Sequence, residues 1–350
     1  MAEHTRIEWT DATWNPITGC TLVSEGCRNC YAAGLAATRL KNHPSRVGLA
    51  RVNARGEAKF TGEVRMNEQW LDQPLRWKRP RKIFVCAHSD LFHENVPDEW
   101  IDRVFAVMAL ASHHTFQVLT KRPERAREYM SHLQSPIYFT DLAIASRKGG
   151  VALVGDIGFL RNHPVGPLPN VWLGTSVEDQ ATADARIPYL LATPAAVRFV
   201  SAEPLLGPVD LTSIPDPSGL KHSYMDALRG KFWMPPEHVD WPTQSRPVNG
   251  RLNVNLCGWL DWIICGGESG KNARPMHPDW ARSLRDQCQA AGVAFHFKQW
   301  GQYEADQIGP EDARSVNYPP GHVIFRKVGK KAAGRELDGR TWDELPEART

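Results

Sequence analysis

The chain has 350 residues, with 42 Lys and Arg against 39 Asp and Glu, and its mean hydropathy is -0.42. No stretch approaches the roughly 20 apolar residues that cross a bilayer, so we expect no membrane association. The net charge of +3 is too small to indicate nucleic-acid binding by itself. An odd number of cysteines, seven in all, argues against a disulfide framework. Because no apolar leader opens the chain, we expect a cytoplasmic protein.

Short apolar runs that end in small or polar residues predict seven β-strands. In chain order they cover Ala12–Pro16, Ile83–His88, Phe116–Thr120, Val171–Thr175, Val197–Ala202, Trp262–Gly266 and Val293–Lys298. Apolar residues at helical spacing between these runs predict helices over Asp98–Ser112, Pro123–His132, Gln180–Leu191 and Asp279–Ala291. The alternation predicts an α/β fold with a parallel sheet, either a partial or complete (β/α) barrel or an open doubly wound sheet.

The length suggests about two domains, but α/β barrels of this size often form one unit. We therefore expect one barrel-type domain over residues 1–301 and a C-terminal extension over residues 302–350. Three stretches lack the periodic pattern and are rich in Gly, Pro, Arg and Asn or contain scattered Trp. They predict insertions at about 40–66, 141–170 and 208–258.

Polar residues follow nearly every predicted strand. In parallel α/β folds the reactive side chains gather at the carboxyl ends of the strands, so these residues should meet at one mouth. This convergence favours an enzyme over a scaffold. The candidate catalytic residues are Asp90, Lys121, Arg122, Glu178 and Lys298.

Each candidate also has a structural interpretation. Glu178 and Glu203 are equally explained as helix caps, and Asp90 as part of a helix-entry turn. Lys121 and Arg122 suit a bound phosphate or carboxylate, or a salt bridge to Glu124 or Glu203.

Cys20, Cys27 and Cys30 lie within eleven positions and predict a metal site. A structural zinc ion normally takes four protein ligands, and a fourth would have to come from His4, His43, Cys86 or Cys265. Three cysteines agree better with an iron–sulfur cube that keeps one iron open for substrate or cofactor. Cys86 and Cys265 are also explained as buried core residues.

Several motifs between Trp14 and Gly301 carry a resemblance: WNPITGC, GCRNCYA, SDLFHENVP, LTKRP, SAEPLLGPVDL, GGESG, ARPMHPDW and FKQWG. With them the chain resembles a phage-borne family of three-cysteine-motif proteins of unknown function. A cysteine loop after the first strand of a parallel barrel is also similar to the radical S-adenosylmethionine (SAM) superfamily.

Three features depart from that superfamily. Six residues separate Cys20 from Cys27, where the superfamily has three, and Asn29 occupies the position of an aromatic residue. Its Gly-Gly-Glu motif follows the second strand, whereas Gly266–Glu268 follows the sixth predicted strand here. This turn is also explained as a tight strand-to-helix connection.

The resemblance implies a [4Fe-4S] cluster on the three cysteines, with SAM as cofactor and an external electron donor. The residues that would hold SAM are Gly266, Gly267, Glu268, Ser176, Ser201 and Glu203. It further implies an enzyme that generates a 5'-deoxyadenosyl radical to modify or repair a nucleic acid, a nucleotide or a related substrate.

Two other functions remain open from the residues alone. The first is a zinc-stabilised nucleic-acid-binding protein without redox chemistry. It would use the cationic runs at Arg76–Lys82 and Arg326–Lys331, with Trp233, Trp241 and Trp259, in or at the edge of the 208–258 insertion, to stack on bases. The second is a degenerate barrel that holds a cluster for stability or redox sensing.

Overall fold

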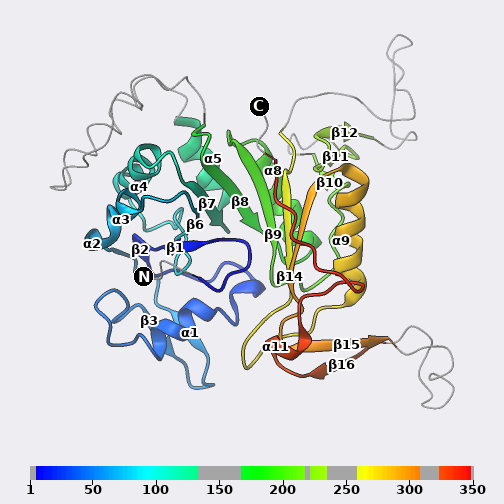
Figure 1. The fold of residues 1–350 in the computed structure, drawn as a ribbon, viewed down its shortest axis with the longest axis horizontal. Coiled ribbons are helices and arrows are strands. Elements are labelled where there is room, and N and C mark those ends of the chain that lie inside the picture. Colours follow the sequence, from blue (N-terminus) through cyan, green and yellow to red (C-terminus); the bar gives the residue numbers. More distant parts are fainter. Residues whose placement is uncertain (1–4, 133–166, 217–220, 235–257, 308–322, 348–350) are drawn as a thin grey trace, which may run out of the picture.

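A computed structural model describes residues 5–132, 167–216, 221–234, 258–307 and 323–347 (Figure 1). Most of the predicted insertion at 141–170, part of the one at 208–258, and His4 lie outside these residues.

Seven strands form the central sheet, and they correspond to the seven predicted strands. In spatial order they are β1 (Ala12–Trp14), β6 (Lys82–Val85), β7 (Thr115–Thr120), β8 (Val171–Ser176), β9 (Val197–Ala202), β13 (Trp262–Gly266) and β14 (Ala294–Gln299). Every neighbouring pair is parallel, and the sheet curls into a half-barrel (Figure 1). The predicted parallel α/β sheet is confirmed in its partial-barrel form.

Two strand ends differ from the prediction. The second strand was expected to reach His88, but β6 ends at Val85 because Cys86 has a φ of 56°, outside the extended region. The first strand was expected to reach Pro16 but ends at Trp14. A proline has no N–H to donate to the sheet ladder.

Four helices confirm the predicted ones: α4 (Asp98–Leu110), α5 (Pro123–His132), α8 (Gln180–Leu191) and α9 (Pro278–Ala291). Local chemistry sets their ends. The side chain of Asp179 accepts a hydrogen bond from the backbone N–H of Thr182 at 2.9 Å and so caps α8. Gly292 ends α9 with a φ of 67°, a conformation that favours glycine.

Aromatic side chains fill the inside of the half-barrel. Trp9 contacts Phe84, Phe199 and Trp262, with ring centroids 4.8, 6.5 and 6.2 Å apart. A Cβ atom on Gly174 would lie 2.5 Å from the Phe199 ring, so only glycine lets that ring enter the interior. Two of these aromatic residues, Trp9 and Phe84, line a cavity that also contains residues from the carboxyl ends of the strands.

The remaining elements are short and were not predicted. The helical ones are η1 (Glu25–Cys27), α1 (Tyr31–Ala37), α2 (Glu68–Leu71), α3 (Gln73–Arg76) and α11 (Lys330–Ala333). The strands are β2 (Ile17–Thr18), β3 (Ala50–Val52), β4 (Ala58–Phe60), β5 (Arg65–Met66), β10 (Ile214–Pro215), β11 (Tyr224–Asp226), β12 (Lys231–Trp233), β15 (Tyr303–Gln307) and β16 (Val323–Lys327). In the described part of the chain, no helix has the length and apolar character needed to cross a membrane.

Candidate functional site

The three cysteines lie on one loop at the carboxyl edge of the sheet. Cys20 follows β2, Cys27 ends η1, and Cys30 directly precedes α1. Tight turns hold the second pair: the N–H of Cys27 donates to Ser24 O at 2.9 Å, and that of Cys30 donates to Cys27 O at 3.3 Å. All three line one cavity of about 460 Å³, and their thiols form no disulfide.

Burial favours the protonated thiol at Cys20 and Cys30. It raises the pKa of Cys20 to about 12, helped by the negative charge of Asp90 and opposed by the Arg122 guanidinium. Burial also raises the pKa of Cys30. Because thiolates are the metal ligands, metal binding at this loop must release protons.

Three cysteines of one loop are the possible ligands of a metal centre. Among the described residues, no three His, Cys, Asp or Glu side chains lie close enough together to hold one metal ion. A zinc ion takes four protein ligands at one point, whereas in an iron–sulfur cube each cysteine binds a different iron.

The possible fourth ligands differ in position. Cys86 is buried and lines the same cavity, whereas Cys265 is fully buried in β13 and does not line it. His43 stacks on Trp70 with ring centroids 5.9 Å apart, and its Nδ1 is 2.7 Å from Ser45 Oγ.

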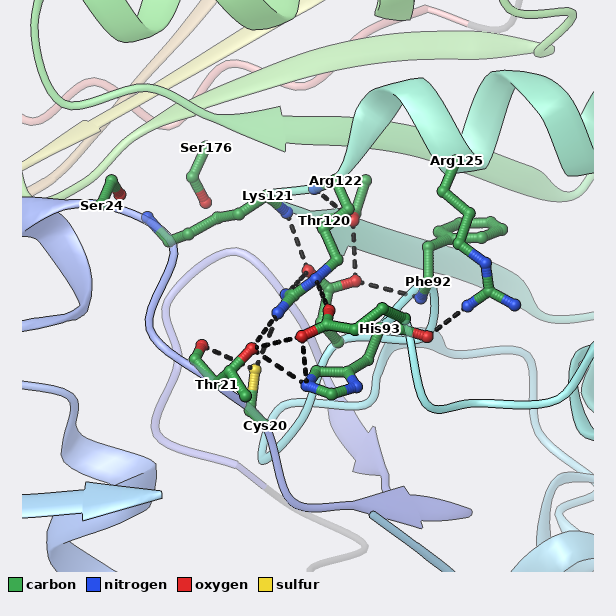
Figure 2. A network of polar contacts seen from close by, with 12 residues as sticks. Cys20, Thr21, Ser24, Phe92, His93, Thr120, Lys121, Arg122, Arg125 and Ser176 are labelled. Atoms are coloured by element: carbon green, nitrogen blue, oxygen red, sulfur yellow. Dashed lines mark hydrogen bonds and ion pairs between the residues drawn. The ribbon is translucent and has the colours of Figure 1, made fainter. Parts of the chain in front are cut away.

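Asp90 and Arg122 connect the strand ends to the cysteine loop (Figure 2). The buried carboxylate of Asp90 accepts hydrogen bonds from Thr120 Oγ1 at 2.7 Å, the N–H of Lys121 at 2.9 Å and Arg122 Nη1 at 3.1 Å. Arg122 also donates to the hydroxyl of Thr21 and lies 3.8 Å from Cys20 Sγ. Both candidates are thus engaged with each other and place the start of the loop.

Glu178 is buried next to the cysteine loop and supports it. It is 1% exposed, does not line the cavity, and pairs with Lys121 and with Arg186 at 3.1 Å. Ser24 of the cysteine loop donates to it at 3.0 Å. A Cβ atom on Gly26 would lie 2.3 Å from its carboxylate, so only glycine allows this close packing. The helix-cap interpretation of Glu178 is wrong, since Asp179 is the cap.

Glu203 and Lys298 form an ion pair inside the cavity. Lys298 Nζ lies 2.7 and 2.9 Å from the two carboxylate oxygens. Ser176 and Ser201, from the neighbouring strands, line the same cavity. Gly266 lies behind this pair rather than on the cavity surface; a Cβ there would be 3.4 Å from Glu203.

The Gly-Gly-Glu turn is fastened to the cysteine loop. Glu268 accepts from Arg274 Nε at 2.9 Å and Nη2 at 2.7 Å, and from Asn29 Nδ2 at 3.0 Å. Burial opposes ionisation, but these hydrogen bonds hold the pKa of Glu268 below its usual value. Its carboxylate is therefore engaged by the protein. A Cβ on Gly267 would lie 2.0 Å from Trp300 O, so the ends of β13 and β14 approach only because this residue is glycine.

Sequence patterns missed the residues that hold these groups in place. Asn29 was noticed only as a departure from a motif, and Arg274 and Ser24 were not singled out. No spacing rule links Asn29 to Glu268, because they are 239 positions apart. Tyr31, which is 52% exposed and lines the cavity beside Cys30, was also missed.

Comparison with known proteins places the chain in a family and goes no further. Curated proteins and solved structures gave no match. The family described as "Protein of unknown function (DUF5131)" matches residues 4–346, nearly the whole chain, and the chain belongs to that family.

Proposed function

We propose that this DUF5131 protein is a radical SAM-type iron–sulfur enzyme that modifies or repairs a nucleic acid, a nucleotide or a related substrate. One observation carries the proposal. Three thiols of one loop line a single cavity at the carboxyl mouth of a parallel half-barrel. The cytoplasmic location and the phage-borne family stay predictions.

Cys20, Cys27 and Cys30 would hold a [4Fe-4S] cluster through three of its irons. With one electron from an external donor, the bound cluster would supply reductive cleavage of the sulfonium C–S bond of SAM, which yields methionine and a 5'-deoxyadenosyl radical able to take a hydrogen atom from substrate. Of the residues expected to hold SAM, Ser176, Ser201, Glu203, Gly267 and Glu268 line the cavity, with Glu203 already paired with Lys298. Glu268 would act indirectly, because it holds the cysteine loop in place through its hydrogen bond with Asn29.

The chain's own residues prepare the site for such chemistry. Ile7, Trp9 and Phe84 line the cavity floor and limit the access of water to a reactive intermediate. Lys121 and Lys298 line the cavity and are placed by Glu178 and Glu203. Two lysines fixed in this way suit a carboxylate or a phosphate group of SAM or of the substrate.

Metal analysis tests the proposal. After anaerobic purification and reconstitution, we expect about four irons and four sulfides per chain. Cys27→Ala should lose the cluster, whereas Cys86→Ala, a matched buried cysteine of the same cavity, should keep it. Stoichiometric zinc without iron uptake would overturn the proposal in favour of a zinc-stabilised binding protein. Equal iron loss in both variants would mean that the ligand set is wrong.

A further inference from the structure

Positive charge is concentrated in two segments of the chain. The first basic segment, residues 28–65, has eight Lys and Arg against two Glu and contains α1 and the β3–β4 hairpin. The second basic segment, residues 323–335, has five Lys and Arg and no Asp or Glu, and contains β16 and α11. Together they carry +11 in a chain of net charge +3, so all other residues together carry -8.

Both segments border the cavity mouth, from different sides. In the first, Lys59 Nζ donates to the carbonyl of Arg28 at 2.8 Å, between Cys27 and Cys30. In the second, Lys327 donates to the carbonyl of Lys271, in the turn that follows Glu268. Figure 1 shows α1 and β3 on one side, and α11, β15 and β16 on the other, beneath the sheet. The mouth thus has two positively charged flanks.

Eight of these thirteen cations help to hold the fold through hydrogen bonds or ion pairs within the described residues. The buried Arg46 is one of them, because its Nη2 lies 2.8 Å from His88 Nδ1. By contrast, several exposed cations have no ion-pair partner within the described ranges: Arg39, Lys41, Arg51, Arg55 and Lys331. Unpaired cations on both flanks repel one another and are available to a polyanion.

The first basic segment also contributes two aromatic rings to the cavity wall. Tyr31 and Phe60 both line the cavity, and Tyr31 is 52% exposed. Proteins that bind single-stranded nucleic acids combine cationic grooves for the phosphates with aromatic side chains on which bases stack. An acidic protein would compete for the same cations, and competition by polyglutamate tests for such a partner.

We propose that the two basic segments bind the phosphodiester backbone of a single-stranded nucleic acid across the cavity mouth, with bases over Tyr31 and Phe60. This inference rests on the proposed function, because it names the class of substrate on which the proposed enzyme would act. Binding itself needs neither cluster nor SAM, so the two proposals fail separately. Loss of SAM cleavage with binding intact overturns only the enzyme.

Charge reversal on each flank tests the surface. Fluorescence anisotropy of a labelled single-stranded oligonucleotide is measured against the purified protein at several salt concentrations. Arg51→Glu/Arg55→Glu on one flank and Arg326→Glu/Lys331→Glu on the other should each weaken binding about tenfold. Each lost phosphate contact should also reduce the slope of log affinity against log salt by about 0.7.

The matched control is Lys78→Glu/Arg79→Glu. These exposed cations precede β6, so they lie at the amino edge of the parallel sheet, opposite the mouth. The control should bind like the wild type. Three results would overturn the proposal: no salt-dependent binding by the wild type, equal weakening in the control, or displacement of the oligonucleotide by polyglutamate as readily as by unlabelled oligonucleotide.

Discussion

Asn29 Nδ2 donates a hydrogen bond to Glu268 Oε2 at 3.0 Å and joins the cysteine loop to the turn after β13. The same amide donates to Asn272 O at 2.8 Å. Asn29 stands between Cys27 and Cys30, so these two bonds fasten the part of the loop that carries two of the three thiols. A polar contact thus occupies the position where the radical SAM motif, which this loop resembles, has an aromatic residue.

We expect Asn29→Ala to loosen the cysteine loop. A hydrogen bond to a charged group contributes about 1.5 to 3 kcal/mol, so the free energy of opening the loop should fall by an amount in this range. Hydrogen exchange of the backbone amides of residues 20–30 measures this opening, and the global unfolding free energy should change much less.

Asn95→Ala is the control for that variant, because Asn95 Nδ2 also donates to a backbone carbonyl, that of Gly62 at 3.0 Å. Its exchange at residues 20–30 should match the wild type. Identical exchange in Asn29→Ala and wild type would show that the polar contact has no role in ordering the loop.

The ion pair of Glu203 and Lys298 predicts a second effect. Both side chains are largely buried, at 19% and 15% exposed, so Lys298→Met leaves a carboxylate without its cation. We expect a loss of about 1 to 3 kcal/mol in unfolding free energy, measured by urea denaturation. The double variant Glu203→Gln/Lys298→Met should recover most of the loss. If the loss of unfolding free energy in the double variant equalled the sum of the losses in Glu203→Gln and Lys298→Met, the two side chains would not be energetically coupled.

His296 predicts a loss of stability in acid. Burial lowers its pKa to about 4, and neither ring nitrogen makes a hydrogen bond. The unfolded chain therefore binds a proton more readily between pH 6.5 and 4. The contribution of His296 to the free energy of unfolding should be fully present above pH 6.5. It should fall by about 2 to 3 kcal/mol as the pH decreases towards 4.

His296→Leu isolates this contribution. His88, whose pKa burial also lowers to about 4, is present in both proteins and cancels in the comparison. The fall in unfolding free energy from pH 6.5 to 4 should be smaller in the variant by the amount that His296 supplies. Parallel curves for wild type and variant would contradict the assignment.

The strands of the sheet were predictable because burial leaves a local signal. Val197–Ala202, for example, is a compact apolar run in sequence and a central strand in the structure. The short hairpin of β3 and β4 gave no such signal, since three-residue strands with half-exposed side chains show no clear alternation.

The site was predictable only in part. In a parallel sheet the carboxyl ends of all strands lie at one edge. This arrangement brings Cys20, Ser201 and Lys298 together at one cavity. The partner of each charge was not predictable, because pairs such as Glu268 and Arg274 or Lys121 and Glu178 depend on the course of loops. Those pairs decide which carboxylates remain available to a ligand.

Formation of 5'-deoxyadenosine from SAM tests the central claim most directly. The reconstituted wild-type protein, incubated anaerobically with SAM and a strong reductant, should release 5'-deoxyadenosine and methionine, while Cys27→Ala should release neither. An intact cluster with no cleavage of SAM would contradict the account and leave a protein that uses its cluster for stability or redox sensing.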